Sequence, residues 1–209
     1  LTLHAELRPQ PGTRFSVAGP VDVVNAAPGP IDRERIPVRR ARAHIQASDE
    51  ALQVEEIDAS LVRGALRGRF EIAFARLDEW QARATFTGVD PATLHSRLRS
   101  YTLDGQAELT QAAGDMAITG RLRNRVGLPL QATLDLRASA ARVRINTAQL
   151  TLGRGQATVA GEVRLTGSQA TTLAGHVVEL EPELLVKGID ARLTGAFNDD
   201  GVLAQQPAG

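Results

Sequence analysis

Residues 65–74 read ALRGRFEIAF, a stretch in which apolar and charged side chains alternate. Its large apolar members are Leu66, Phe70, Ile72 and Phe74, and the charged residues between them are Arg67, Arg69 and Glu71. Successive side chains of a β-strand point to opposite faces of the sheet, whereas a helix repeats its faces about every 3.6 residues. The stretch therefore predicts a strand with one apolar face and one polar face.

The same alternation extends along most of the 209 residues, in short runs that Gly, Asp, Asn or Pro separate. Further examples are residues 15–23, 116–122, 130–136 and 157–165. Short strands with turn residues between them are typical of antiparallel hairpins. We expect about 14 strands at the usual length of about 5–6 residues. The predicted fold class is therefore all-β, with an antiparallel sheet.

The alternation also predicts which side chains share the apolar face. The candidate residues for this face are Leu66, Phe70, Ile72, Phe74, Met116, Ile118, Leu134, Leu136, Val159 and Val163. The sequence offers little to cover them, because it holds one Trp, one Tyr and five Phe and no long helical pattern. Two interpretations stay open. Either a second sheet, or the same sheet curled on itself, buries the face as a sandwich core, or the face is available to a ligand.

Composition argues against several classes of function. The 24 basic and 24 acidic residues balance, whereas a nucleic-acid-binding protein needs an excess of positive charge to neutralise phosphates. The absence of cysteine excludes disulfides, thiolate metal sites and a cysteine nucleophile. The four histidines are scattered and lack the spacing of metal ligands. We therefore expect no enzyme activity, no cofactor, no metal site and no nucleic-acid partner.

One basic cluster breaks the even distribution of charge. Arg33, Arg35, Arg39, Arg40 and Arg42 follow a Pro-rich interruption of the strand pattern. The cluster is either a solvated connection between strands or a contact for anionic lipid headgroups, and the sequence leaves both interpretations open.

Two acidic-Pro pairs interrupt the strand pattern, 91 residues apart. Asp90-Pro91 and Glu181-Pro182 each have the cap residue and first-turn proline of a helix start, and Leu follows in both. We expect short helical turns near 91–98 and 182–186. The same offset relates Gly64 to Gly155, which indicates weak internal repeats over about 52–110 and 143–197. Stacked repeats predict an elongated architecture. Residues 1–209 are therefore expected to form a single elongated β fragment of a larger protein, since the chain begins within an alternating run.

Three segments carry a resemblance to a known family. They are residues 82–109 (ARATFTGVDPATLHSRLRSYTLDGQAEL), Leu128-Pro129-Leu130, and residues 148–163 (AQLTLGRGQATVAGEV). Their order of strand, Gly-containing hairpin, strand, acidic-Pro turn and Gly-bearing strand resembles the TamB family within the AsmA-like superfamily. The resemblance covers about residues 50–197.

The resemblance implies a fold, a location and a function. The implied fold is a long, folded-over sheet with an apolar inner groove, shaped like a half-pipe or taco. The implied setting is the Gram-negative periplasm, with the parent protein anchored in the inner membrane and reaching an outer-membrane BamA-type partner. The implied function is the movement of phospholipid between the two membranes, assistance to outer-membrane protein assembly, or both. The ten candidate residues would then line a groove for phospholipid acyl chains.

A second function stays open beside this one. An elongated sheet has open edges, and its unpaired N–H and C=O groups can pair with another strand. The chain would then be a structural or protein-binding module that acts by β-augmentation without lipid. For the same reason we expect that the fragment can self-associate through its sheet edges.

Overall fold

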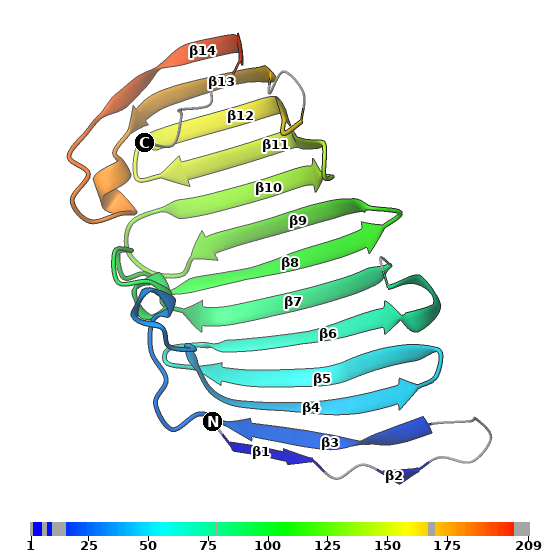
Figure 1. Ribbon diagram of the computed structural model, residues 1–209. Coiled ribbons are helices and arrows are strands. Elements are labelled where there is room, and N and C mark those ends of the chain that lie inside the picture. The colour runs from blue at the N-terminus through cyan, green and yellow to red at the C-terminus, as the bar shows by residue number, and fades with distance from the viewer. Residues whose placement is uncertain (1, 6–7, 10–15, 78, 167–169, 203–209) are drawn as a thin grey trace, which may run out of the picture.

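The computed structural model describes residues 2–5, 8–9, 16–77, 79–166 and 170–202. These residues form one 14-stranded antiparallel sheet in which strands follow each other in space in chain order (Figure 1). The exception lies at the first edge, where β1 and β2 both pair with β3. The expected all-β fold with an antiparallel meander of strands is confirmed.

The strands are Thr2–Ala5 (β1), Arg8–Pro9 (β2), Ser16–Val24 (β3), Val38–Ser48 (β4), Ala51–Leu61 (β5), Ala65–Ala73 (β6), Trp80–Val89 (β7), Leu103–Ala112 (β8), Asp115–Asn124 (β9), Leu130–Ala138 (β10), Arg142–Leu152 (β11), Gly155–Arg164 (β12), Ala170–Leu180 (β13) and Leu193–Val202 (β14). Four short helical segments connect strands: η1 (Ile31–Arg33), η2 (Phe74–Arg76), α1 (Pro91–Leu94) and η3 (Pro182–Leu184).

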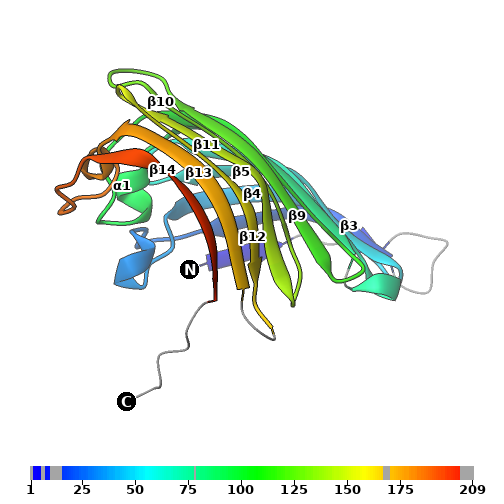
Figure 2. The same ribbon diagram turned by 90° about the horizontal axis from the view of Figure 1, so that it is seen from above.

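The sheet is open, elongated and curved. Strands β1 and β14 lie at opposite edges of a path of 13 strands, and its 12 intervals of about 4.8 Å add up to roughly 58 Å. Figure 2 shows that the strands arch, and that α1 and the connection containing η1 lie beneath the arch. The sheet is thus folded over along its length without closing into a barrel or a sandwich.

β-Bulges contribute to the curvature, and they recur at the spacing of the predicted repeat. The pairing shifts register between Val54 and Ile57 of β5, and 91 residues later between Ile145 and Ala148 of β11. It shifts again between residues 86 and 89 and between 177 and 180, which also differ by 91. A bulge bends and twists its strand. The two stretches 52–110 and 143–197 therefore share the order of their strands and the positions of two bends.

The expected short helical turns form after both acidic-Pro pairs. Asp90 caps α1 by accepting a hydrogen bond from the Ala92 N–H at 3.0 Å, but the helix ends at Leu94 because His95 is extended. Leu98 is not helical and instead forms a bridge with Val186. The second turn is the 3-10 segment η3, which lies within the expected range 182–186.

Candidate functional site: an apolar sheet face closed at one end

Four rows of mostly apolar residues cross the sheet, each built from directly paired positions on neighbouring strands. The row through Leu66 consists of Leu3, Val23, Ala41, Ala59, Leu66, Phe86, Gly105, Leu122, Ala132, Leu150, Ala157, Val177 and Gly195. Paired positions point to the same face. This row is therefore apolar or glycine across all 13 strands of the path.

The other three rows run parallel to the first. The second contains Ile57, Gly68, Ala84, Ala107, Gly120, Leu134, Ala148, Val159, Gly175 and Phe197. The third contains Gly19, Ile45, Val54, Phe70, Ala82, Leu109, Ile118, Leu136, Ile145, Gly161 and Leu173. The fourth contains Val17, Ala47, Leu52, Ile72, Trp80, Gln111, Met116, Ala138, Val143, Val163 and Thr171. These four rows make up the apolar face.

The register places nine of the ten candidate residues on the apolar face. Phe74 is the exception. It begins η2 rather than continuing β6, and its side chain is 40% exposed. The candidate set also omits Phe86, Leu109 and Leu122, which the alternation in residues 80–89 and 103–124 would have found.

Little of the chain covers the apolar face. Among the described residues, the buried apolar side chains are Ala18, Ala59, Val89, Leu103, Leu130 and Leu152. The nine candidates on the face are all intermediate in exposure. Within the part of the chain that the structure describes, one sheet accounts for all the strands, so no second sheet covers this face. The interpretation in which a second sheet buries the face is therefore wrong.

One end of the apolar face is nevertheless packed. Leu103, Leu130 and Leu152 form a buried cluster, and their partly buried neighbours include Tyr101, Leu184 and others of the long connections. Leu152 is 1% exposed. The apolar face is thus closed where the strands lead into residues 90–102 and 181–192.

Three connections meet at this end: residues 25–37, 90–102 and 181–192, which together form the end cap. Asp32 Oδ1 accepts a hydrogen bond from the Ser96 N–H at 2.9 Å, and the Ser96 hydroxyl donates to the other oxygen. Lys187 Nζ donates to the Ser96 carbonyl at 3.0 Å. The Ser96 hydroxyl, followed by its N–H, holds the pKa of Asp32 below the ordinary value for aspartate. Ser96 thus joins all three connections.

The second and third connections also pair through their backbones. The Arg99 N–H donates to the Leu185 carbonyl at 2.9 Å, and the Lys187 N–H donates to the Arg97 carbonyl at 2.8 Å. The Tyr101 hydroxyl donates to the Leu184 carbonyl, and burial raises the pKa of Tyr101. These contacts join segments more than 80 residues apart, and they hold the ends of β7–β8 and β13–β14 in the same cap.

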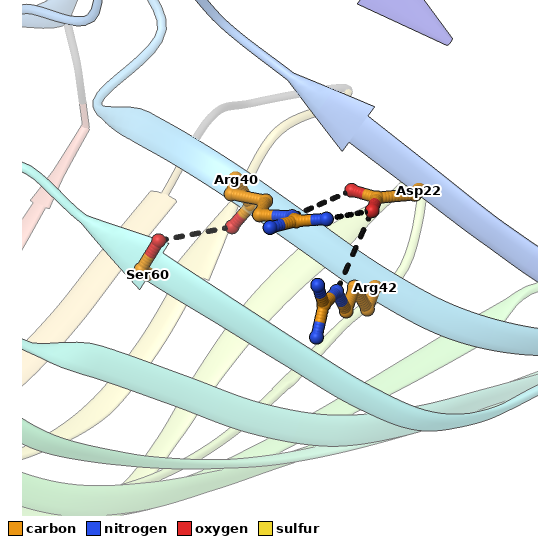
Figure 3. Close-up of polar contacts among 4 residues, drawn as sticks. All are labelled: Asp22, Arg40, Arg42 and Ser60. Atoms are coloured by element: carbon orange, nitrogen blue, oxygen red, sulfur yellow. Dashed lines mark hydrogen bonds and ion pairs between the residues drawn. The ribbon is translucent and has the colours of Figure 1, made fainter. Parts of the chain in front are cut away.

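The opposite face of the sheet is polar, and its charges are paired across strands. Asp22, Arg42, Asp58 and Arg67 occupy directly opposed positions on four consecutive strands. Figure 3 shows Arg40 and Arg42 converging on Asp22, at 2.8 Å from Arg40 Nε to Oδ1 and 3.4 Å from Arg42 Nε to Oδ2. The hydrogen bond from Arg40 lowers the pKa of Asp22. Two members of the basic cluster are therefore paired within the sheet.

A shallow hollow of about 500 Å³ lies on the polar face over β7 to β10. Its lining includes Arg83, Glu108 and Arg121, with threonines between them. Arg83 Nη2 lies 2.7 Å from Glu108 Oε1, so these charges already neutralise each other. Of the ten candidates, only Leu134 lines this hollow.

In the ranges that the structure describes, no group of three or more His, Asp or Glu side chains is placed to hold a metal ion. No helix in the same ranges has the length and hydropathy that a membrane crossing requires.

Comparisons of the chain with protein-family models, with curated proteins and with solved structures return no match. The resemblance to the TamB family therefore stays a prediction that rests on the sequence segments quoted above.

Proposed function

We propose that this chain is the lipid-handling part of a TamB-like periplasmic protein, and that its apolar face receives phospholipid acyl chains. The parent would be anchored in the inner membrane and would reach a BamA-type protein in the outer membrane. The face would serve the movement of phospholipid between the membranes and, through it, outer-membrane biogenesis. The chain would act without catalytic residues or a cofactor.

A single observation carries the proposal: a continuous apolar face crosses 13 strands, and within the described residues no second layer lies over its middle. Exposed apolar surfaces of this extent mark binding sites in soluble domains. The end cap closes one side only, so the rows remain accessible along their length. Aliphatic side chains dominate these rows, and they provide a surface without the shape of one particular ligand.

Magnitudes favour acyl chains as the occupant. Burying hydrocarbon stabilises by about 0.8 kcal/mol per CH₂, so a sixteen-carbon chain gains on the order of 12 kcal/mol on leaving water. At about 3.4 Å per residue, strands of 9 to 11 residues are roughly 30–37 Å long, which accommodates such a chain along a strand. The roughly 58 Å across the strands provides room for several chains side by side.

The experiment places a photo-crosslinking amino acid at Ile118, in the third row of the apolar face. The matched control is Thr119, the next residue on the same strand, which is exposed on the polar face. We expect crosslinks to phospholipid from position 118 and few from 119 after mild extraction, with native mass spectrometry reporting co-purified lipid. Equal capture at both positions, or none at 118, would contradict the proposal.

The alternative function is a protein-binding module that acts by β-augmentation. The observation in its favour is the open edge of β14, whose described side chains are all exposed. A strand added there would gain main-chain hydrogen bonds without using the apolar face. A protein crosslinked to β14, with no lipid captured at Ile118, would favour this alternative.

A further inference from the structure

The two ends of the apolar face differ in polarity. From β5 to β13, the first three rows contain only apolar side chains and glycine. The fourth row lies farthest from the end cap, and within the same strands it also contains Trp80, Gln111 and Thr171. A boundary between apolar and hydrogen-bonding side chains thus crosses the face at the end opposite the end cap.

Trp80 and Gln111 are the central pair of this boundary, and they are directly opposed on β7 and β8. Trp80 Nε1 donates a hydrogen bond to Gln111 Oε1 at 2.8 Å. The centroid of the Trp80 ring system lies 6.2 Å from that of Phe70, which belongs to the third row. The indole therefore lies beside apolar side chains while its N–H bonds to an amide, an environment in which tryptophan is typical of the interface between hydrocarbon and water.

The other end of the face is apolar and closed. The buried leucine cluster lies there, and Tyr101 and Leu184 of the end cap pack against it. The Tyr101 hydroxyl already donates its hydrogen bond to the Leu184 carbonyl. At the end of the fourth row, by contrast, short hairpin loops such as 49–50 and 113–114 join the strands. A bound amphipathic molecule thus meets packed hydrocarbon at one end of the face and hydrogen-bonding side chains at the other.

Charge at the end of the fourth row also suits a phosphate. Arg142 begins β11, Arg164 ends β12, and the two are directly paired beside Val143 and Val163 of the fourth row. Both guanidinium groups lie 3.8 Å from the one carboxylate of Glu162, so these three residues together carry a positive charge. Arginine pairs readily with phosphate oxygens.

We infer that the apolar face binds phospholipid in one orientation, with the acyl chains along the strands, their methyl ends toward the end cap, and the ester and phosphate groups beyond the fourth row. This inference rests on the proposed function, because it assigns the direction of a lipid on that face. On β6 the first and fourth rows are six residues apart, from Leu66 to Ile72, or about 20 Å. One leaflet of a bilayer's hydrocarbon core is about 15 Å thick, so an acyl chain fits between the end cap and the fourth row.

The test uses Trp80, the single tryptophan of the chain, as a probe of the fourth row. The purified chain is loaded with phosphatidylcholine that carries a nitroxide quencher at carbon five or at carbon sixteen of one acyl chain, and it is then separated from free lipid. We expect the label at carbon five, near the ester, to cause the greater loss of Trp80 fluorescence. An equal loss from the two labels, or a greater loss from carbon sixteen, would overturn the orientation.

The matched control moves the probe to the other end of the face. Trp80→Phe combined with Leu66→Trp places the single tryptophan in the first row, on the neighbouring strand β6. The order of the two labels should reverse in this variant, because carbon sixteen then lies nearer the probe. The same order at both positions would contradict a lipid that lies along the strands.

Phosphate analysis of the loaded chain separates the orientation from the proposed function. Bound phospholipid together with the wrong order of quenching contradicts the orientation alone. A chain that retains no phospholipid contradicts both, since there is then no bound lipid to orient.

Discussion

At the scale of single residues, phenylalanine packs over glycine at two places on the apolar face. Phe86 is paired with Gly105, and Phe197 is paired with Gly175. In both pairs a Cβ on the glycine would lie 2.3 Å from the ring Cζ. The glycine thus supplies the space that the ring occupies, which sequence alternation alone does not reveal.

The effect of a Gly→Ala substitution on stability should therefore depend on which atoms surround the glycine. At Gly105 a Cβ would also lie 2.4 Å from the Arg121 carbonyl oxygen, so Gly105→Ala overpacks the site and should lower the free energy of unfolding by about 1–3 kcal/mol. At Gly120, on the next strand, the nearest atom to a Cβ is 3.4 Å away. Gly120→Ala should therefore be neutral or stabilise by about 0.4–1 kcal/mol. Urea unfolding of both variants tests this, and equal destabilisation would contradict it.

At the scale of elements, the end cap combines a local signal with long-range contacts. The acidic-Pro signal at Asp90 produces a capped turn, and the buried Asp90 also accepts a hydrogen bond from the Ser100 hydroxyl at 2.7 Å. These two hydrogen bonds to Asp90 fix the local shape of the connection 90–102. Its position over the apolar face depends instead on Ser96 and Arg99, whose partners lie 64 and 84 residues away.

The link between Asp32 and Ser96 should make the end cap sensitive to acid. Hydrogen bonds from Ser96 lower the pKa of folded Asp32. A lowered pKa stabilises the fold above the unfolded value of about 3.9, and this stabilisation is lost as pH falls through the folded pKa. Asp32→Asn should therefore lower the Tm at pH 7, and the difference from wild type should shrink below about pH 4.

The control for this prediction is Asp58→Asn. Asp58 pairs with Arg67 on the exposed polar face at 3.4 Å and is not part of the end cap. Exposed pairs contribute little to stability, so the Tm at pH 7 should change less than in Asp32→Asn. Thermal unfolding followed by circular dichroism from pH 3 to pH 7 measures both, and a difference for Asp32→Asn that is independent of pH would contradict the assignment.

At the scale of the whole molecule, the chain exposes more surface than a compact protein of its size. Its accessible surface is 13681 Å². A compact monomer of 22.3 kDa exposes about 9,400 Å². A single curved layer explains the excess, because one sheet has two faces and covers neither. A single layer lacks the stabilisation that a second packed layer provides in other domains.

Occupation of the apolar face should therefore raise the stability of the whole chain. A short-chain phosphatidylglycerol below its micelle concentration should raise the Tm by about 5–10 °C at a hundred times its Kd. Leu134→Asp places a carboxylate on the face, which should abolish the increase because an unpaired charge in hydrocarbon costs several kcal/mol. The Thr133→Asp variant, altered on the polar face of the same strand, should keep the increase in Tm. Differential scanning calorimetry distinguishes these outcomes, and an equal increase in both variants would count against binding at this face.

Much of the apolar face follows from the sequence alone. Because side chains alternate strictly along a strand, the pattern in residues 65–74 places Leu66, Phe70 and Ile72 together without knowledge of their neighbours. The start of α1 is equally local, since the cap and the first-turn proline are adjacent in the chain. Phe74 lies outside β6, and alternation cannot detect where a strand ends and a 3-10 turn begins.

The tertiary structure alone decided how the face is closed and where it stays open. Bulges at residues 54–57 and 145–148 bend the strands, and this curvature brings Asp32, Ser96 and Lys187 together. The same packing ends α1 at Leu94, because Leu98 pairs with Val186 instead of extending the helix. Alternation is a property of each strand by itself, whereas the end cap depends on the summed bend of many strands, which no local segment encodes.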